Sequence, residues 1–200
     1  MIKLAPMVAF VAAIVAATPV FAGAFGVEMG AKPAALGAKP MASDNPGPLK
    51  RYTLDTAPKP NTAFESYVLF ATTATGVCKI TAIGRDHEGD INGLDLRGQF
   101  EEFSKLLTDK YGGNEAFDYL KAGSIWNDPQ DFAMALKQKE RTLASFWASS
   151  TGAKLPADLV GISLEGHASG PSATYLTLSY EFANFAACAD QQTTSNNSGL

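Results

Sequence analysis

The sequence predicts an α+β fold: an antiparallel sheet built from two hairpins, with two amphipathic helices packed on one face. Three observations lead to this prediction. The β-rich segments occur in two pairs, each pair is joined by a linker of hairpin length, and the stretch between the pairs repeats its apolar residues at helical intervals. Strands, then helices, then strands are the order expected of an α+β domain whose sheet buries one face.

The first hairpin is expected from two β-rich segments, residues 66–72 and 77–83, joined by the short linker 73–76. Successive side chains of a strand point to opposite faces of the sheet. Because Lys79 must face water, its neighbour Cys78 is expected to point into the core.

Two helices are expected between the hairpins. The first ends at Gly112 and Gly113, which suit a left-handed helix terminus. The second starts clearly, since Asp128 can cap it and Pro129 suits the first helical position. The apolar stripe of the first helix comprises Leu96, Phe100, Phe103, Leu107 and Tyr111. That of the second comprises Phe132, Leu136, Leu143, Phe146 and Trp147.

The second hairpin supplies one candidate catalytic set. Its strands alternate apolar and polar residues on either side of a turn at residues 169–172. Ser163, Glu165 and His167 would share the exposed face, and a hydrolase could use them, because a nucleophile needs a base within hydrogen-bond reach. Polar residues, however, occupy the exposed face of any half-buried sheet. The turn predicts these opposite pairs: His167 with Tyr175, Glu165 with Thr177, and Ser163 with Ser179.

The N-terminus has the layout of a bacterial signal peptide. Lys3 precedes an apolar run, and small or tolerated residues precede a cleavage position after Ala22. A transmembrane anchor is the weaker alternative, because the apolar run is shorter than the roughly 20 residues that a bilayer requires. We therefore expect a periplasmic or secreted protein. The expected organisation is a signal peptide (1–22), an Ala/Gly/Pro/Lys-rich segment that is partly loop (23–60), a single α+β domain (61–190) and a disordered tail (191–200).

The charge of the chain limits the kinds of partner expected, and its two cysteines predict a disulfide. Without Lys3 the chain has 15 basic and 20 acidic side chains, a formal charge of −5, and it has no basic patch. Nucleic acid is therefore not an expected partner, and neither is an anionic membrane surface. Separately, no membrane span is expected in the mature chain. In an oxidising compartment an isolated pair of cysteines usually bonds, so we predict a disulfide between Cys78 and Cys188, with two separate thiols as the alternative. No cofactor is predicted.

Three phrases resemble an uncharacterised group of exported bacterial proteins. The resemblance covers residues 25–188, but this chain departs from the group after Met29, where a stretch rich in Ala, Lys and Pro replaces a helical segment. The group has no assigned activity, so the resemblance implies only export and fold. The phrases are Phe25-Gly26-Val27-Glu28-Met29-Gly30, Gly123-Ser124-Ile125-Trp126 and Lys139-Glu140-Arg141-Thr142-Leu143-Ala144-Ser145-Phe146-Trp147.

Two further candidates lie in loops. Glu88, Asp90 and Asn92 occupy the first, third and fifth places of a calcium-type loop, but Gln99 stands at the twelfth place, where a bidentate Glu is needed. The loop is therefore interpreted as a solvated connection to an acidic helix N-terminus, and no metal is predicted. Trp126 either caps the core or anchors a partner, since Trp is common among interface hot spots.

These features favour a non-catalytic binding or interaction domain of the bacterial envelope, whose partner is an envelope protein, an extracellular protein or a small ligand. The alternative is a small periplasmic hydrolase that uses the last hairpin, or an acidic pair such as Glu101 and Asp118. An enzyme should show a concave pocket with convergent titratable groups. A binding domain should show an exposed apolar patch or an open sheet edge.

Overall fold

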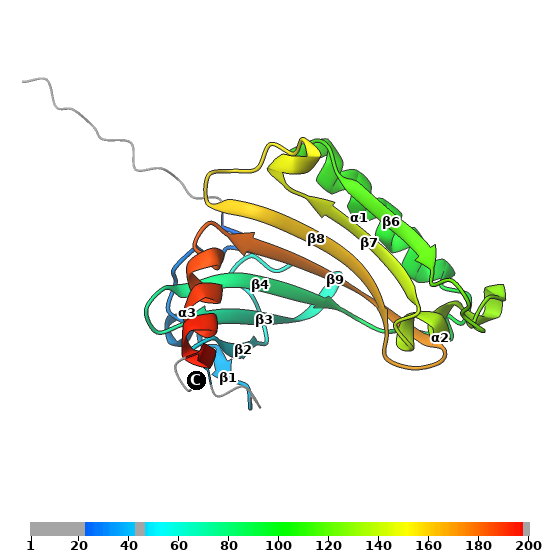
Figure 1. Cartoon of the computed structure of the whole chain (residues 1–200), viewed down its shortest axis with the longest axis horizontal. Coiled ribbons are helices and arrows are strands. Elements are labelled where there is room, and N and C mark those ends of the chain that lie inside the picture. The colour runs from blue at the N-terminus through cyan, green and yellow to red at the C-terminus, as the bar shows by residue number, and fades with distance from the viewer. Residues whose placement is uncertain (1–22, 43–46, 198–200) are drawn as a thin grey trace, which may run out of the picture.

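One large antiparallel sheet organises the molecule (Figure 1). The computed structural model describes residues 23–42 and 47–197, so the predicted signal peptide lies outside the described residues. Neighbouring strands follow the order β1-β2-β3-β4-β9-β8-β7-β6, and β5 pairs with β9. The strands are β1 (Lys39–Pro40), β2 (Lys50–Leu54), β3 (Phe64–Thr72), β4 (Gly76–Gly84), β5 (His87–Glu88), β6 (Glu115–Leu120), β7 (Arg141–Trp147), β8 (Leu159–Ala168) and β9 (Ala173–Phe182).

Three α-helices and three short 3-10 turns complete the described chain. The helices are α1 (Leu94–Tyr111), α2 (Phe132–Lys137) and α3 (Phe185–Asn197), and the turns are η1 (Pro33–Leu36), η2 (Pro129–Asp131) and η3 (Ser149–Thr151). The predicted α+β class with an antiparallel sheet is therefore confirmed. The two predicted hairpins correspond to β3–β4 and β8–β9, but the sheet also extends through β6 and β7, which the two-hairpin arrangement did not include.

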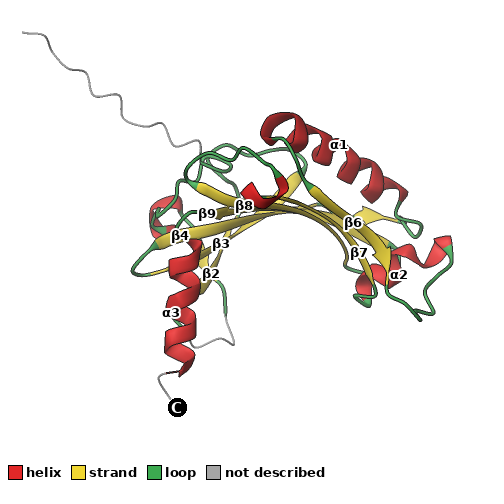
Figure 2. Ribbon diagram, turned by 45° about the horizontal axis from the view of Figure 1, so that its top comes forward, coloured by secondary structure: helices red, strands yellow, loops and turns green. Residues whose placement is uncertain are grey.

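The sheet is curved, and its two faces differ (Figure 2). Helix α1 lies over the convex side, which we call the covered face. The concave side, which we call the open face, has α3 only at its β4 end. The core lies between α1 and the covered face, where the Phe64 and Phe103 rings are 5.4 Å apart and Trp147 Nε1 donates to Thr108 Oγ1 at 3.3 Å.

The apolar stripe of α1 was predicted correctly. Its five members are all buried, and they pack against covered-face residues of the central strands such as Leu164 and Leu176. Burying a side chain of this size contributes about 1.5–3 kcal/mol to folding, so this stripe holds α1 on the sheet.

The second predicted helix is wrong beyond its first turns. It starts as expected, with Pro129 as the first residue of η2, but α2 ends at Lys137. Lys139 has a φ of 58°, which a helix cannot continue through. The following residues form β7, where Leu143 and Trp147 face the core. A spacing of four residues shares a face in both helix and strand, so this pattern could not separate the two.

The disulfide between Cys78 and Cys188 is present, as predicted. Cys78 is fully buried, as predicted, but the β3–β4 ladder shifts register between Phe70 and Ala71. The bulge leaves Cys78 as an extra residue in β4, buried beneath α3. Lys79, on the open face, lies 5.7 Å from an aromatic ring of the same helix. The disulfide therefore ties α3 to the open-face side of β4.

Both ends of the described chain are more ordered than the composition indicated. Phe25 packs edge-on against Phe64, Tyr67 and Tyr180, so residues near the start of the described chain complete the core. Residues 191–197, for which we expected disorder, continue α3, while residues 198–200 lie outside the described residues. In residues 23–42 and 47–197, no helix has the length and apolarity needed to cross a membrane.

Candidate functional site

The last hairpin forms in the predicted register. His167 lies opposite Tyr175, Glu165 opposite Thr177 and Ser163 opposite Ser179. Laterally paired residues share a face, so this polar set belongs to the open face. It continues onto β4, where Thr81 Oγ1 and Ser179 Oγ are 2.8 Å apart.

The candidate catalytic residues do not form a nucleophile–base pair. Ser163 Oγ donates to Glu165 Oε1 at 3.0 Å, whereas His167 Nε2 lies 3.0 Å from Thr177 Oγ1 and its ring stacks on Tyr175. Four residues along a strand separate Ser163 from His167 by about 13 Å, which is far beyond hydrogen-bond reach. Burial lowers the pKa of His167, although the carboxylate of Glu165 acts in the opposite direction. The arrangement is a hydrogen-bonded sheet surface.

The calcium-type loop caps the start of α1 through Asp90. Asp90 is 6 % exposed, and its carboxylate accepts hydrogen bonds from the amides of Asp95 and Leu96, each at 3.2 Å, and from Thr174 Oγ1 at 2.6 Å. Burial raises the pKa of Asp90, but the hydrogen bonds from Thr174 and the α1 amides outweigh it, so the net shift is downward. Both carboxylate oxygens are thus committed to α1 and β9.

The other proposed members of the calcium-type loop surround Asp90. Glu88 and Asn92 line a shallow hollow with it. Within residues 23–42 and 47–197, no group of three or more His, Cys, Asp or Glu side chains is placed to hold a metal ion. What the structure shows for this loop is the capping of the first turn of α1 by Asp90.

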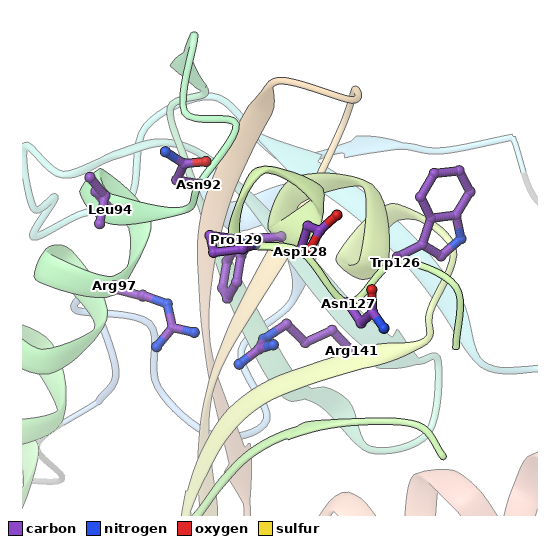
Figure 3. A pocket seen from close by; sticks show the side chains of 9 residues that line it. Asn92, Leu94, Arg97, Trp126, Asn127, Asp128, Pro129 and Arg141 are labelled. Carbon is purple, nitrogen blue, oxygen red and sulfur yellow. The ribbon is translucent and has the colours of Figure 1, made fainter. Parts of the chain in front are cut away.

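Trp126 is half-buried and lines the largest of the described cavities, of about 520 Å³ (Figure 3). The sequence analysis did not single out the residues opposite it. Arg97 and Arg141 project into this cavity from α1 and β7. Asp118, considered above as half of an acidic pair with Glu101, instead forms ion pairs with both arginines.

A second cavity, of about 320 Å³, opens on the concave side of the sheet. Its rim is apolar, with Phe146 38 % exposed and Val160 47 % exposed. Glu165 and Glu181 line it, together with Lys79, which pairs with Glu181 at 3.0 Å. This hollow lies among the open-face residues of β4, β7, β8 and β9.

Aromatic side chains extend the apolar rim toward the edge of the sheet. The rings of Phe117 and Phe146 are 5.9 Å apart and meet edge to face. Tyr119 follows on β6 and is 54 % exposed. Sequence alternation alone could not find this cluster, because the prediction placed Phe146 on a helix and did not include β6 as a strand.

Comparison with protein-family models, with curated proteins and with solved structures finds no match to this chain. Its function must therefore be argued from the geometry described above.

Proposed function

We propose that this chain is an exported, non-catalytic domain that binds a polypeptide segment on the open face of its sheet, in the periplasm or the medium of a bacterium. The observation that carries the proposal is the aromatic cluster of Phe117, Tyr119 and Phe146 beside the open-face cavity, in which Tyr119 and Phe146 are exposed and Phe117 is half-buried.

The apolar content of the open face supports a macromolecular partner. Large aromatic side chains at such exposure are typical of interface centres, because burying them contributes both area and specific ring contacts. Because Phe146 is 38 % exposed, covering its remaining area contributes roughly 0.6–1.1 kcal/mol, about two fifths of the value for burying a whole Phe side chain. On the covered face, by contrast, α1 already buries the equivalent residues.

The edge of the sheet next to this cluster supports an extended partner. Strand β6 pairs with β7 along one side, and in the part of the chain that the structure describes no strand pairs with its other side. An unpaired edge offers backbone donors and acceptors to an added strand. A polypeptide bound there would place alternate side chains on Phe117 and Tyr119.

Charge narrows the chemistry of the bound segment. Lys79 forms an ion pair with Glu181, and Glu165 accepts a hydrogen bond from Ser163 at Oε1. The cavity therefore offers one net negative charge and an acceptor beneath an apolar rim. A segment that carries a Lys or Arg beside an apolar residue suits this combination.

Two features support export. The disulfide is typical of proteins that fold in an oxidising compartment. The predicted signal peptide, which lies outside the described residues, would direct the chain there. We do not propose the hydrolase alternative, because Ser163 and His167 lie too far apart to act as nucleophile and base.

The test uses a photo-crosslinking amino acid at Phe146 and two matched glycine substitutions. A Cβ at Gly161 would meet only Glu181 Oε2 at 3.7 Å, so a side chain can begin there without a clash, and we expect Gly161→Leu to extend into the open-face cavity. A Cβ at Gly98 meets nothing within 4 Å on the exposed side of α1, so Gly98→Leu is the control.

We expect the crosslinker at position 146 to give one discrete polypeptide adduct in native cells. Gly161→Leu should reduce that adduct at least about tenfold, the loss expected from about 1.4 kcal/mol of binding energy, and Gly98→Leu should leave it unchanged. An adduct equally strong from a crosslinker at Leu106, which is 56 % exposed on α1, would refute the proposal. So would an adduct that survives Gly161→Leu.

A further inference from the structure

The cavity at the other side of the sheet holds two arginines that share one aromatic ring (Figure 3). Arg97 Cζ lies 4.4 Å from the centroid of the Phe132 ring, and Arg141 Cζ lies 4.7 Å from the same centroid. Figure 3 shows the two guanidinium groups pointing toward each other from α1 and β7. They come from positions 44 residues apart in the sequence, so only the tertiary structure brings them together.

The fold holds this arrangement tightly. Phe132 is 4 % exposed and packs directly on Gly93, where an added Cβ would come within 2.0 Å of the Phe132 ring. Asp118 receives Arg97 Nη1 on one carboxylate oxygen at 2.9 Å and Arg141 Nη2 on the other. One carboxylate thus fixes both guanidinium planes.

The two guanidinium groups retain unused donors. Each carries five N–H bonds, and Asp118 accepts one from each. Arg141 Nε is buried, and among the described residues no acceptor lies within hydrogen-bond distance of it. Because this Nε is enclosed by the protein, a ligand in the cavity would instead bond to the Nη groups, whose remaining N–H donors Asp118 does not use.

The other residues that line the cavity, and its volume, indicate what kind of molecule would fit beside the arginines. Leu94, which is 70 % exposed, and Trp126 form an apolar rim above the arginines. Asp128 also lines the cavity, and together with Asp118 it balances the formal charge of the two arginines. The cavity offers directional N–H donors from the arginines and apolar contact from Leu94 and Trp126, which lie on opposite sides of them in Figure 3. A volume of about 520 Å³ is within the usual range for small-molecule sites.

We infer that this cavity binds a small organic carboxylate, whose charged group bonds to Arg97 and Arg141 and whose apolar body lies against Leu94 and Trp126. A planar carboxylate matches the fork of a guanidinium, and each arginine gives Asp118 only one of its five N–H groups. The site is separate from the open face, so this inference does not depend on the proposed function.

Calorimetric titration of the purified full chain with 3-phenylpropanoate tests the inference, with 3-phenylpropanamide as the uncharged probe of the same shape. We expect the carboxylate to bind at least about tenfold more tightly than the amide, as charge-assisted hydrogen bonds require. Arg97→Gln should remove that preference. The matched control is Arg51→Gln, because Arg51 is exposed on β2 away from the cavity, and it should leave the affinity unchanged.

Two further variants separate binding from folding. Arg97→Lys keeps the charge that balances Asp118 but lacks the planar fork, so it should fold and bind the carboxylate several-fold more weakly. Asp118→Asn removes the internal competitor and should bind it more tightly. Equal affinity for acid and amide, or unchanged affinity in both Arg97 variants, would overturn the inference. Inorganic phosphate binding as tightly as 3-phenylpropanoate would overturn the assigned ligand class.

Discussion

Substituting Gly93 by alanine should destabilise the protein in two separable ways. Gly93 has a φ of 68°, in the left-handed region, where an L-residue with a Cβ costs about 1–2 kcal/mol. The new Cβ would also come within 2.0 Å of a Phe132 ring atom that is buried in the core. Overpacking of this kind typically costs about 1–3 kcal/mol. The expected loss is therefore about 2–5 kcal/mol.

Gly89→Ala is a matched control for the backbone contribution. Gly89 has a φ of 81°, and a Cβ there would meet nothing within 4 Å. It should therefore lose only the backbone contribution of about 1–2 kcal/mol. The difference between the two variants isolates the contact between Gly93 and Phe132.

Urea denaturation followed by circular dichroism measures both variants, and thermal melting provides a second reading. For a chain of this length, 1 kcal/mol corresponds to a shift of about 2–4 °C in Tm. Gly93→Ala should melt several degrees below Gly89→Ala, and it should also weaken carboxylate binding, because Phe132 supports both arginines. Equal destabilisation by the two substitutions would refute the assignment of Gly93 to the packing of Phe132.

Two other predictions concern the disulfide and a histidine. The disulfide closes a separation of 110 residues, so replacing Cys78 and Cys188 together by alanine should cost up to about 4–5 kcal/mol on the chain-entropy model, and an unchanged urea midpoint would contradict this. Burial lowers the pKa of His167 below its ordinary value of 6.5, so below that pH the unfolded chain binds the proton more readily. His167 therefore contributes stability above about pH 6.5 that is lost as the pH falls through its folded pKa. His167→Gln should flatten this dependence relative to the parent between pH 7 and 5, and parallel curves would contradict the assignment.

The parts of the fold that were predicted correctly depend on residues close together in the sequence. The α1 stripe from Leu96 to Tyr111 could be identified because helical spacing is a local property. The pairing of Glu165 with Thr177 followed from a short turn, because a tight connection determines which residues of a hairpin oppose each other. The Cys78–Cys188 bond followed from the number of cysteines and the predicted compartment.

Other features required the assembled sheet. Trp147 belongs to a strand because β6 and β8 pair with its segment, while its spacing from Leu143 also suits a helix. Cys78 faces α3 because of a bulge, and the alternation of its neighbours could not show an extra residue.

The sequence by itself determined the α+β class with its antiparallel sheet, the first helix and the register of the last hairpin, since each follows from local periodicity, and it predicted the cysteine pair from composition. Only the tertiary structure decided which face of the sheet stays open, and that Arg97 and Arg141 meet on Phe132. The physical reason is that such contacts join segments far apart in the chain. Their formation depends on how the sheet curves and which helix covers it, and no short stretch of residues specifies either property.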